Sequence, residues 1–353
     1  MASVPTELSK ARAEKPLLAV LKGERRDPVP TWMMRQAGRY LPEYRQLRHD
    51  RGSFLELVYD SDAAARITLQ PLERFPEIDA AILFSDILIV PFAIGQNLTF
   101  VAGEGPRLTP PLTSANLDDL TPFLTRLEPI YETVAKVRAQ LGEGKTLIGF
   151  AGSPWTVATY MVAGQGSRDQ SEARRLAYAD NERFGEIIAR IEHVTVEYLS
   201  CQIDAGAEAV QLFDSWAGSL SPAQFEQWVI APTARIVAAL RERHAGVPVI
   251  GFPKGAGGKL SAYARETAVS ALGLDETVDP CWAASELPKD LPLQGNLDPL
   301  ALVAGGEVLE TAVGRVLDAF VDRPHIFNLG HGILQDTPIE HVGELIALVK
   351  GAR

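Results

Sequence analysis

A segment near the N-terminus concentrates arginine in an otherwise acidic chain. Residues Met33–Arg51 read MMRQAGRYLPEYRQLRHDR and hold five arginines, no lysine, and only two acidic residues, Glu43 and Asp50. Arginine binds carboxylate or phosphate through two parallel hydrogen bonds and keeps its charge out of water. Because the whole chain has a formal net charge of −11, the rest of its surface competes poorly for anions. The segment therefore predicts a site for a small molecule with several negative charges. An exposed helix with solvated charges is the alternative.

Polar side chains also follow short apolar runs that have the character of buried strands. Asp86 follows AILFS, Ser215 follows VQLFD, and His331 lies between two glycines after IFNL. The full set of candidates of this kind is Asp86, Ser153, Tyr160, Asp214, Ser215, Lys254, Asp279 and His331. Their carboxylates, hydroxyls, amine and imidazole could bind a ligand or transfer protons.

Each candidate has a structural alternative. Loop aspartates commonly cap helices or fix turns, and Ser153 is a plausible N-cap for a helix that begins at Pro154. Tyr160 could be a core ring with its hydroxyl at the surface. His331 is the hardest to explain structurally, because glycines on both sides let the backbone approach a ligand closely. The other histidines, His49, His193, His244, His325 and His341, are expected to be surface or packing residues.

Eight short apolar segments are predicted to be the strands that position these side chains. They are Pro30–Met34, Ala80–Phe84, Thr146–Phe150, Ala209–Phe213, Val247–Phe252, Glu276–Val278, Leu291–Gln294 and His325–Leu329. Helical stretches separate most of them, including Asn181–Ala205, Ser221–His244 and Ala301–Phe320. This alternation predicts an α/β fold with a parallel sheet, and a count near eight favours a single (β/α)8 TIM-type barrel, in which residues that follow strands meet at one mouth. A doubly wound sheet is the alternative, but no GxGxxG follows the first strand.

Local signals place the N-terminal elements. Residues 1–16 are expected to be a flexible segment and residues 17–353 a single barrel domain, because no linker or internal repeat divides the chain. Leu17–Leu21 is expected to be a short helix. Gly38 should keep Arg35 and Arg39 on a loop, and Pro42 should begin a helix that ends near Gly52. A capping box is predicted at 53–56 and a hairpin at 95–110.

Composition limits the class of partner. Hydrophobic residues make up 46% of the chain, which supports a large core, and the pI is about 5.1. Such an acidic chain is not expected to bind nucleic acid or an anionic membrane. Cys201 and Cys281 lack metal-ligand spacing, so they are expected to be free, buried thiols in a reducing compartment. No signal peptide or membrane-spanning run is recognisable, and a cytoplasmic location is expected.

Six segments of the chain, in order, resemble the characteristic segments of the uroporphyrinogen decarboxylase family. They are WMMRQAGRYLPEYR, FSDILIVP, GFAGSPWTVATYM, QLFDSWAG, QGNLDP and NLGHGI, and they extend from Trp32 to Ile333. The resemblance implies a (β/α)8 barrel, a homodimer, and a reaction without metal or organic cofactor. In that reaction the four acetate side chains of uroporphyrinogen III become methyl groups, giving coproporphyrinogen III and four CO2 in haem biosynthesis.

The resemblance also implies the residues that do this chemistry. The substrate-binding residues would be Arg35, Gln36, Arg39, Arg48, Asp86, Phe150, Tyr160, Ser215 and His331, with Asp86, Arg35, Tyr160 and His331 taking part in catalysis. Asp86 would accept hydrogen bonds from the pyrrole N–H groups and stabilise a ring cation. Arg35 is expected to be essential but is a poor acid, so the proton donor stays open between His331, Arg48 and a relayed water.

Four other functions compete with this interpretation. A corrinoid-dependent methyltransferase would share the fold, but it needs a zinc site of the His-x-Cys kind, and the matching strand end reads GFPKGAGG. A metal-dependent lyase could use Asp86, Asp214 and Asp279. Lys254 could form a Schiff base. A tetrapyrrole carrier would bind the macrocycle without releasing CO2.

Overall fold

The chain folds around a curled, parallel β-sheet. The computed structural model describes residues 14–101, 105–113 and 115–351, so residues 1–13 of the segment expected to be flexible lie outside the described part. Within that part, seven strands pair in chain order, each parallel to the next. They are β1 (Ala80–Ile82), β4 (Thr146–Gly152), β5 (Ala209–Asp214), β6 (Val249–Pro253), β7 (Ala271–Gly273), β8 (Leu293–Gln294) and β9 (His325–Ile326).

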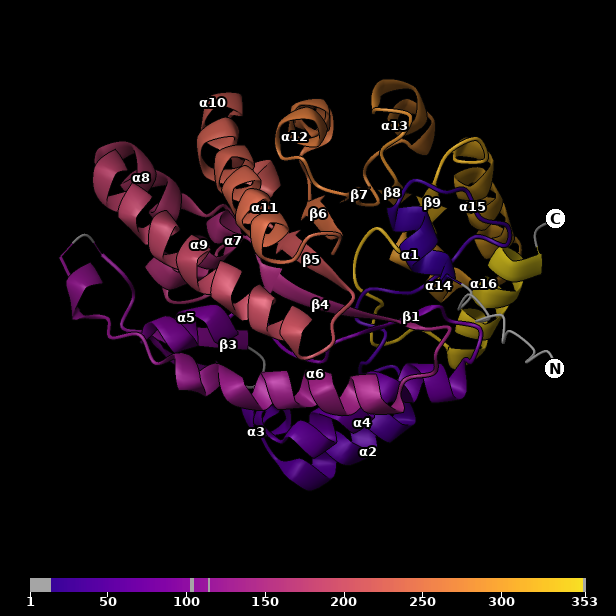
Figure 1. Cartoon of the computed structure of the whole chain (residues 1–353), viewed down its shortest axis with the longest axis horizontal. Coiled ribbons are helices and arrows are strands. Elements are labelled where there is room, and N and C mark those ends of the chain that lie inside the picture. Colours follow the sequence, from indigo (N-terminus) through magenta and orange to yellow (C-terminus); the bar gives the residue numbers. More distant parts are fainter. Residues whose placement is uncertain (1–13, 102–104, 114, 352–353) are drawn as a thin grey trace, which may run out of the picture.

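Helices surround this sheet, as Figure 1 shows. In chain order they are α1 (Pro16–Leu21), α2 (Pro42–Arg51), α3 (Phe54–Tyr59), α4 (Ser61–Arg74), α5 (Ile89–Ile94), α6 (Glu128–Gln140), α7 (Pro154–Ala163), α8 (Ser171–Ala179), α9 (Asn181–Asp204), α10 (Pro222–Phe225), α11 (Ala231–Arg243), α12 (Leu260–Glu266), α13 (Pro280–Glu286), α14 (Pro299–Ala304), α15 (Gly306–Ala319) and α16 (Ile339–Gly351). The alternation of short strands with helices confirms the predicted α/β class.

The first helices form where local sequence signals place them. α1 contains the expected Leu17–Leu21 helix, and Pro42 is the first residue of α2, which ends just before Gly52. The Ser53 hydroxyl accepts the Glu56 N–H, and the Glu56 carboxylate accepts the Ser53 N–H, which is the predicted capping box. The predicted hairpin is the antiparallel pair β2 (Asn97–Val101) and β3 (Gly105–Thr109). In the chain, α1 precedes the arginine-rich segment, α2 forms its second half, and the capping box and the hairpin follow it.

The long helix α9 illustrates how a helix fixes a site residue on the sheet. Its buried face includes Phe184, Ile187 and Ile191, at the spacing of one helical stripe. Near its C-terminal end, the Gln202 side chain accepts the Phe150 N–H at 3.0 Å and donates to the Phe150 carbonyl oxygen at 3.1 Å. This paired hydrogen bond fixes the backbone of Phe150, a predicted site residue on β4.

The predicted strand Pro30–Met34 is reduced to one bridging residue between β9 and β1. Thr31 pairs in parallel with Phe327, whose N–H donates to the Pro30 carbonyl at 2.9 Å. On the other side, the Asp79 N–H donates to the Thr31 carbonyl at 2.9 Å, and the Thr31 N–H donates to the Asp79 carboxylate at 2.7 Å. The segment is short because Met33 begins the turn that leads into the arginine loop.

The prediction of a strand at Glu276–Val278 is wrong. The fifth strand of the parallel sheet is β7, which begins five residues earlier, and 276–278 form a turn. The Asp275 carboxylate accepts the Thr277 N–H at 2.9 Å and thereby closes that turn. Small polar side chains that bond the backbone ahead of them compete with strand pairing, which the apolar pattern alone did not reveal.

Three further expectations need correction. The predicted helix Ala301–Phe320 is two helices, because Gly305 separates α14 from α15. The predicted helix Ser221–His244 contains a π-helical turn at Glu226–Ile230 between α10 and α11. Both cysteines are free as expected, but Cys281 is exposed and Cys201 is only half-buried. The prediction that both thiols are buried is therefore wrong.

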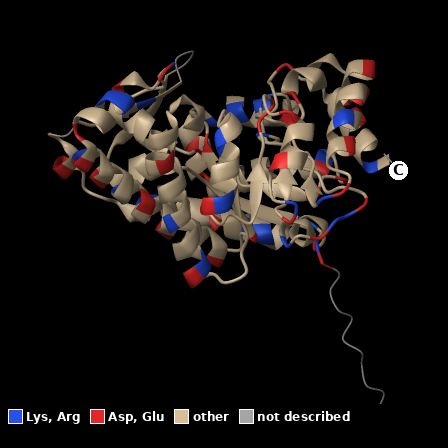
Figure 2. Ribbon diagram, turned by 90° about the horizontal axis from the view of Figure 1, so that it is seen from above, with Lys and Arg blue, Asp and Glu red and all other residues tan. Residues whose placement is uncertain are grey.

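No helix within the described residues is long and apolar enough to cross a membrane. Basic and acidic positions are interspersed over the outer helices rather than gathered on one face, as Figure 2 shows. This distribution leaves the arginine loop as a distinct basic feature beside the mouth of the sheet.

Candidate active site

A cavity of about 710 Å³ lies at the carboxyl ends of the strands. Much of its wall is aromatic. The Phe213 ring lies between Phe150 and Phe252, with centroid distances of 5.6 and 5.9 Å, and the Phe54 ring contacts Phe84 at 5.5 Å. A cavity with an apolar wall and a few polar groups suits a large, flat, partly apolar ligand.

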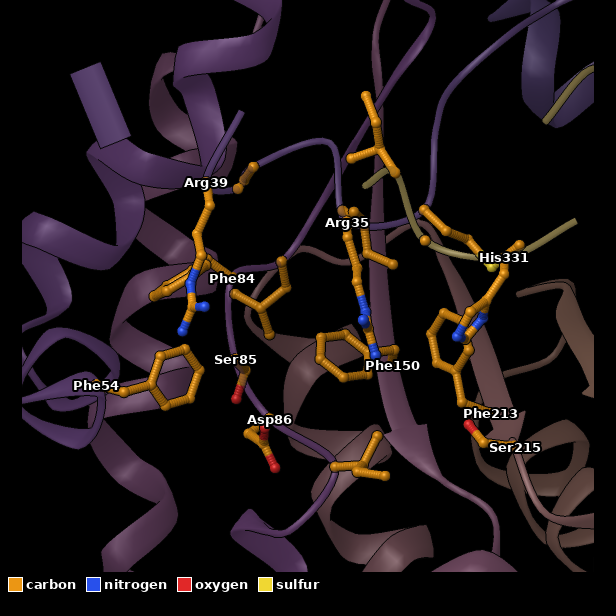
Figure 3. Close-up of a pocket in the computed structure, with 18 of the residues that line it drawn as sticks. Arg35, Arg39, Phe54, Phe84, Ser85, Asp86, Phe150, Phe213, Ser215 and His331 are labelled. Atoms are coloured by element: carbon orange, nitrogen blue, oxygen red, sulfur yellow. The ribbon is translucent and has the colours of Figure 1, made fainter. Parts of the chain in front are cut away.

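Asp86 is placed in this cavity by the loop that follows β1, below Arg35 and Arg39 in the view of Figure 3. One of its carboxylate oxygens accepts the Leu88 N–H at 2.8 Å, so the side chain also fixes the turn into α5. Burial raises the pKa of the Asp86 carboxyl, and the Leu88 N–H and the Arg35 charge oppose that rise. Asp86 therefore both fixes a turn, which was the structural alternative, and presents a carboxyl group to the cavity, as the functional interpretation requires.

Arg35 reaches into the cavity from the loop before α2 (Figure 3). Its backbone has a φ of 60°, a left-handed conformation that few non-glycine residues adopt. Its side chain packs on Gly332, where a Cβ atom would lie only 2.7 Å from the Arg35 Cγ. A glycine is thus required at 332 for the arginine to follow this path, and the expectation that Arg35 lies on a loop is confirmed.

Arg39 lines the same cavity and also a second hollow of about 430 Å³ beside it. Its guanidinium donates to the Gln335 side chain at 3.3 Å. The second hollow is lined by Arg39, Tyr44, Arg45, Arg48, His49 and Gln335. Arg48 therefore lies in the adjoining hollow rather than the larger cavity, and it donates to the Gly52 carbonyl oxygen at 2.6 Å.

Gln36 is not brought to the cavity. Its side chain is fully buried, where it accepts the Met33 N–H at 3.0 Å and donates to the Ala80 carbonyl oxygen at 2.9 Å. These bonds hold the arginine loop against β1. The structure therefore gives Gln36 a supporting position, although the family resemblance implies a contact with substrate.

Tyr160 and Ser215 line the cavity from α7 and from the residue after β5. Burial raises the pKa of the Tyr160 phenol, so its hydroxyl stays protonated at neutral pH and can donate a hydrogen bond. The Tyr160 ring contacts the Trp216 ring with a centroid distance of 6.5 Å. Both hydroxyls are thus available to a polar group of a ligand.

His331 also lines the cavity, on the loop after β9 (Figure 3). Burial lowers the pKa of the His331 imidazole to about 4, and the nearby charges of Lys254 and Arg35 add to this effect. The His331 imidazole in this cavity is therefore neutral at neutral pH. The two flanking glycines let other parts of the protein approach closely. A Cβ at Gly330 would lie 2.6 Å from the Glu276 Cα, and the Arg35 side chain packs against Gly332.

Several candidates take structural positions instead. The Asp279 carboxylate caps α13 by accepting the N–H groups of Cys281 and Trp282. Lys254 forms an ion pair with Glu276 at 3.4 Å. Ser153 is the N-cap residue of α7, as predicted, but its hydroxyl makes no capping hydrogen bond. Asp214 is buried behind Ser215, and burial raises the pKa of its carboxyl to about 7.

Sequence reasoning missed most of the aromatic wall. Phe54, Phe84, Phe213 and Phe252 line the cavity, yet only Phe150 was predicted. A signal was present: Phe84 and Phe213 each stand two residues before a predicted polar site residue, and in an extended chain residues two apart face the same side. Within the described residues, no group of three or more His, Cys, Asp or Glu side chains could hold a metal ion.

This curled parallel sheet, with a carboxylate, arginines and aromatic rings around one mouth, is the architecture of an α/β enzyme with a site for an anionic small molecule. A family model described as "Uroporphyrinogen decarboxylase (URO-D)" matches residues 12–352. The chain therefore belongs to the uroporphyrinogen decarboxylase family.

Individual relatives agree with this assignment. A uroporphyrinogen decarboxylase of Rhizorhabdus wittichii is 67% identical over 99% of this chain and 100% of its own length. One of Novosphingobium aromaticivorans is 65% identical, covering 95% of this chain and 98% of its own length. A solved methyltransferase from Methanosarcina mazei superposes with a TM-score of 0.77 over 96% of this chain and 98% of that chain. At 19% identity, that likeness shows the fold alone.

Proposed function

We propose that this protein is a carboxy-lyase that converts the four acetate side chains of uroporphyrinogen III to methyl groups without a metal or organic cofactor. The products are coproporphyrinogen III and four CO2. The observation that carries the proposal is the placement of Asp86 in an aromatic-walled cavity that Arg35 and Arg39 also line. This cavity offers an apolar surface to the macrocycle, a carboxylate to its pyrrole N–H groups, and guanidiniums to its carboxylates.

The reaction needs an acceptor for the electron pair that CO2 leaves behind. Protonation of a pyrrole ring carbon makes that ring cationic, and the breaking C–C bond delivers its electrons into the ring as CO2 departs. An exocyclic methylene results. A proton then adds to the methylene carbon while the ring carbon loses its extra proton, so each acetate consumes one proton and yields one methyl and one CO2.

Asp86 stabilises the ring cation in this scheme. Burial raises the pKa of the Asp86 carboxyl, but pyrrole N–H groups that donate to the carboxylate favour its charged form. An ionised carboxylate beside the developing cation then lowers the energy of the transition state. One oxygen already accepts the Leu88 N–H, which holds the group in place before substrate arrives.

The remaining groups hold the rim of the macrocycle. Arg35 and Arg39 bind acetate or propionate carboxylates by charge-assisted hydrogen bonds, and the neutral Tyr160, Ser215 and His331 add further hydrogen bonds. Arg48, in the adjoining hollow, is placed to meet a carboxylate that extends from the cavity. The proton donor stays open between His331, Arg48 and a relayed water.

Incubation with uroporphyrinogen III in metal-free buffer, with chromatography of the products, tests the proposal. We expect coproporphyrinogen III and four CO2 for each substrate consumed. Binding of the macrocycle without CO2 release would instead indicate a carrier. Zinc analysis of the purified protein tests the alternative of a corrinoid-dependent methyltransferase, which would require a bound zinc ion.

We also propose that residues 30–32 act as the eighth strand of a closed (β/α)8 barrel. Hydrogen bonds to Phe327 on one side and Asp79 on the other support this role. We further propose that residues 17–353 form one domain. The segment 1–16 was expected to be flexible, but Pro16 begins α1 and the Lys15 ammonium forms an ion pair with Glu208 at 2.6 Å. Limited proteolysis should therefore cut before Lys15 first. We also propose, from the family resemblance, that the protein is a homodimer, which light scattering of the purified protein tests. A cytoplasmic location is a separate proposal, which cell fractionation tests.

A further inference from the structure

We propose that Thr156 is a positioning residue that joins Ser215 and Tyr160 into one rigid unit. The inference rests on the proposed function, because it concerns how the hydroxyls of that cavity are held. Thr156 itself is fully buried and does not line the cavity. It acts through its contacts with the two residues that flank Ser215.

The Thr156 hydroxyl contacts the chain on both sides of Ser215. It donates to the Asp214 carboxylate at 2.5 Å and accepts the Trp216 N–H at 3.0 Å. A second residue of α7 completes the attachment, since the Trp155 indole N–H donates to the Trp216 carbonyl oxygen at 3.1 Å. Ser215 is therefore held between two residues that are both bound to the first turn of α7.

The same helix carries Tyr160. Residues 156 and 160 are four apart and so lie on one face of α7. The Tyr160 ring also contacts the Trp216 ring, with a centroid distance of 6.5 Å. Through Thr156 and Trp216, a shift of the loop after β5 would move Ser215 and Tyr160 relative to each other.

The hydroxyl of Thr156 has no substitute in this position. Asp214 is 1% exposed, and its second carboxylate oxygen has no hydrogen-bond partner within the described structure. Removing the Thr156 hydroxyl would leave the half-buried Trp216 N–H without this partner, and it would take one hydrogen-bond donor from the buried Asp214 carboxyl, which keeps a bond to the Thr156 backbone. Buried polar groups in that condition move to find new partners, and the loop that carries Ser215 would move with them.

The test compares Thr156→Val with Thr156→Ser, and uses Thr159→Val as the matched control. Thr159 lies on the same helix and is equally buried, but its hydroxyl donates to the Thr156 carbonyl oxygen of its own helix. We expect kcat of Thr156→Val on uroporphyrinogen III to fall about tenfold to a hundredfold, since small misplacements of positioning groups have effects of this size. We expect near-normal kcat in Thr156→Ser and Thr159→Val.

Amide hydrogen exchange of residues 214–218 supplies a readout that needs no substrate. Exchange should accelerate in Thr156→Val and stay normal in Thr156→Ser and Thr159→Val. If Thr156→Val does not fold, Thr156→Ala removes the same hydroxyl without placing a second methyl group against the Asp214 carboxyl. Normal exchange and normal kcat in the hydroxyl-deleted variant would overturn the inference. Failure of the wild-type protein to release CO2 would overturn the proposed function alone, because the exchange result stands independently.

Discussion

The side chain of Arg35 lies directly on the Cα of Gly332, although the two residues are 297 positions apart in the chain. A Cβ atom at 332 would be 2.7 Å from the Arg35 Cγ and 2.9 Å from its Nε. This contact joins the arginine loop to the loop of His331. The position of the Arg35 guanidinium in the cavity thus depends on residue 332 having no Cβ atom.

Gly332→Ala should therefore displace Arg35 and lower kcat/KM for uroporphyrinogen III about tenfold to a hundredfold. Steady-state kinetics measures the effect. Gly258→Ala is the matched control, because a Cβ there meets no atom within 4 Å. Equal kinetics in the two variants would show that Arg35 need not follow this path.

Asp86→Asn should abolish most turnover while the protein still folds. The asparagine oxygen can still accept the Leu88 N–H, but it carries no charge to stabilise the ring cation. Loss of one preorganised group of this kind lowers kcat by about a hundredfold to a thousandfold. Single-turnover assays and thermal melting separate the two effects. Turnover at the wild-type rate would refute the role of Asp86 as the central carboxylate.

Arg39→Ala should raise KM by about tenfold, because one charge-assisted hydrogen bond to a substrate carboxylate is lost. Arg51→Ala is the control within the same arginine-rich segment. Arg51 forms an ion pair with Asp60 and does not line the cavity, so its loss should change KM little. If both variants keep the wild-type KM and kcat, the arginine segment is a solvated surface.

Asp214 should make stability depend on pH. Burial raises the pKa of its carboxyl from 3.8 to about 7, so the folded state holds a proton that the unfolded state releases. Its favourable contribution is complete below about pH 4 and is lost as pH rises through 7. From pH 5 to pH 8 the free energy of unfolding should fall by ~3 kcal/mol from this group. Urea unfolding of Asp214→Asn should lack that component, and an identical pH profile would contradict the assignment.

Gln36→Ala should lower stability rather than act first on substrate binding. The variant leaves the Met33 N–H and the Ala80 carbonyl oxygen without their partners, which should reduce the free energy of unfolding by ~2 kcal/mol or more. Gln46→Ala is the control, because the Gln46 side chain donates to the Asp50 carboxylate in exposed hydrogen bonds. A raised KM with unchanged stability would mean that Gln36 contacts substrate directly.

Elements that depend only on neighbouring residues could be predicted from the order of the amino acids. The start of α2 at Pro42, the capping box at Ser53 and the β2–β3 hairpin are local, because each is made by residues a few positions apart. The α/β class followed from the alternation of apolar strands with helices. The arginine loop and the polar residues after strands were also visible, and Arg35, Arg39, Asp86, Tyr160, Ser215 and His331 do line one cavity.

Which side chains face that cavity could not be predicted in this way and was established by the folded structure. Arg48 lines the adjoining hollow, Gln36 turns inward against β1, and the predicted strand at 276–278 is a turn closed by Asp275. The physical reason is that the direction of a side chain is set by contacts between segments far apart in the chain. Gly332 admits Arg35, and Thr156 holds both neighbours of Ser215, and neither relationship has a local pattern from which it could be predicted.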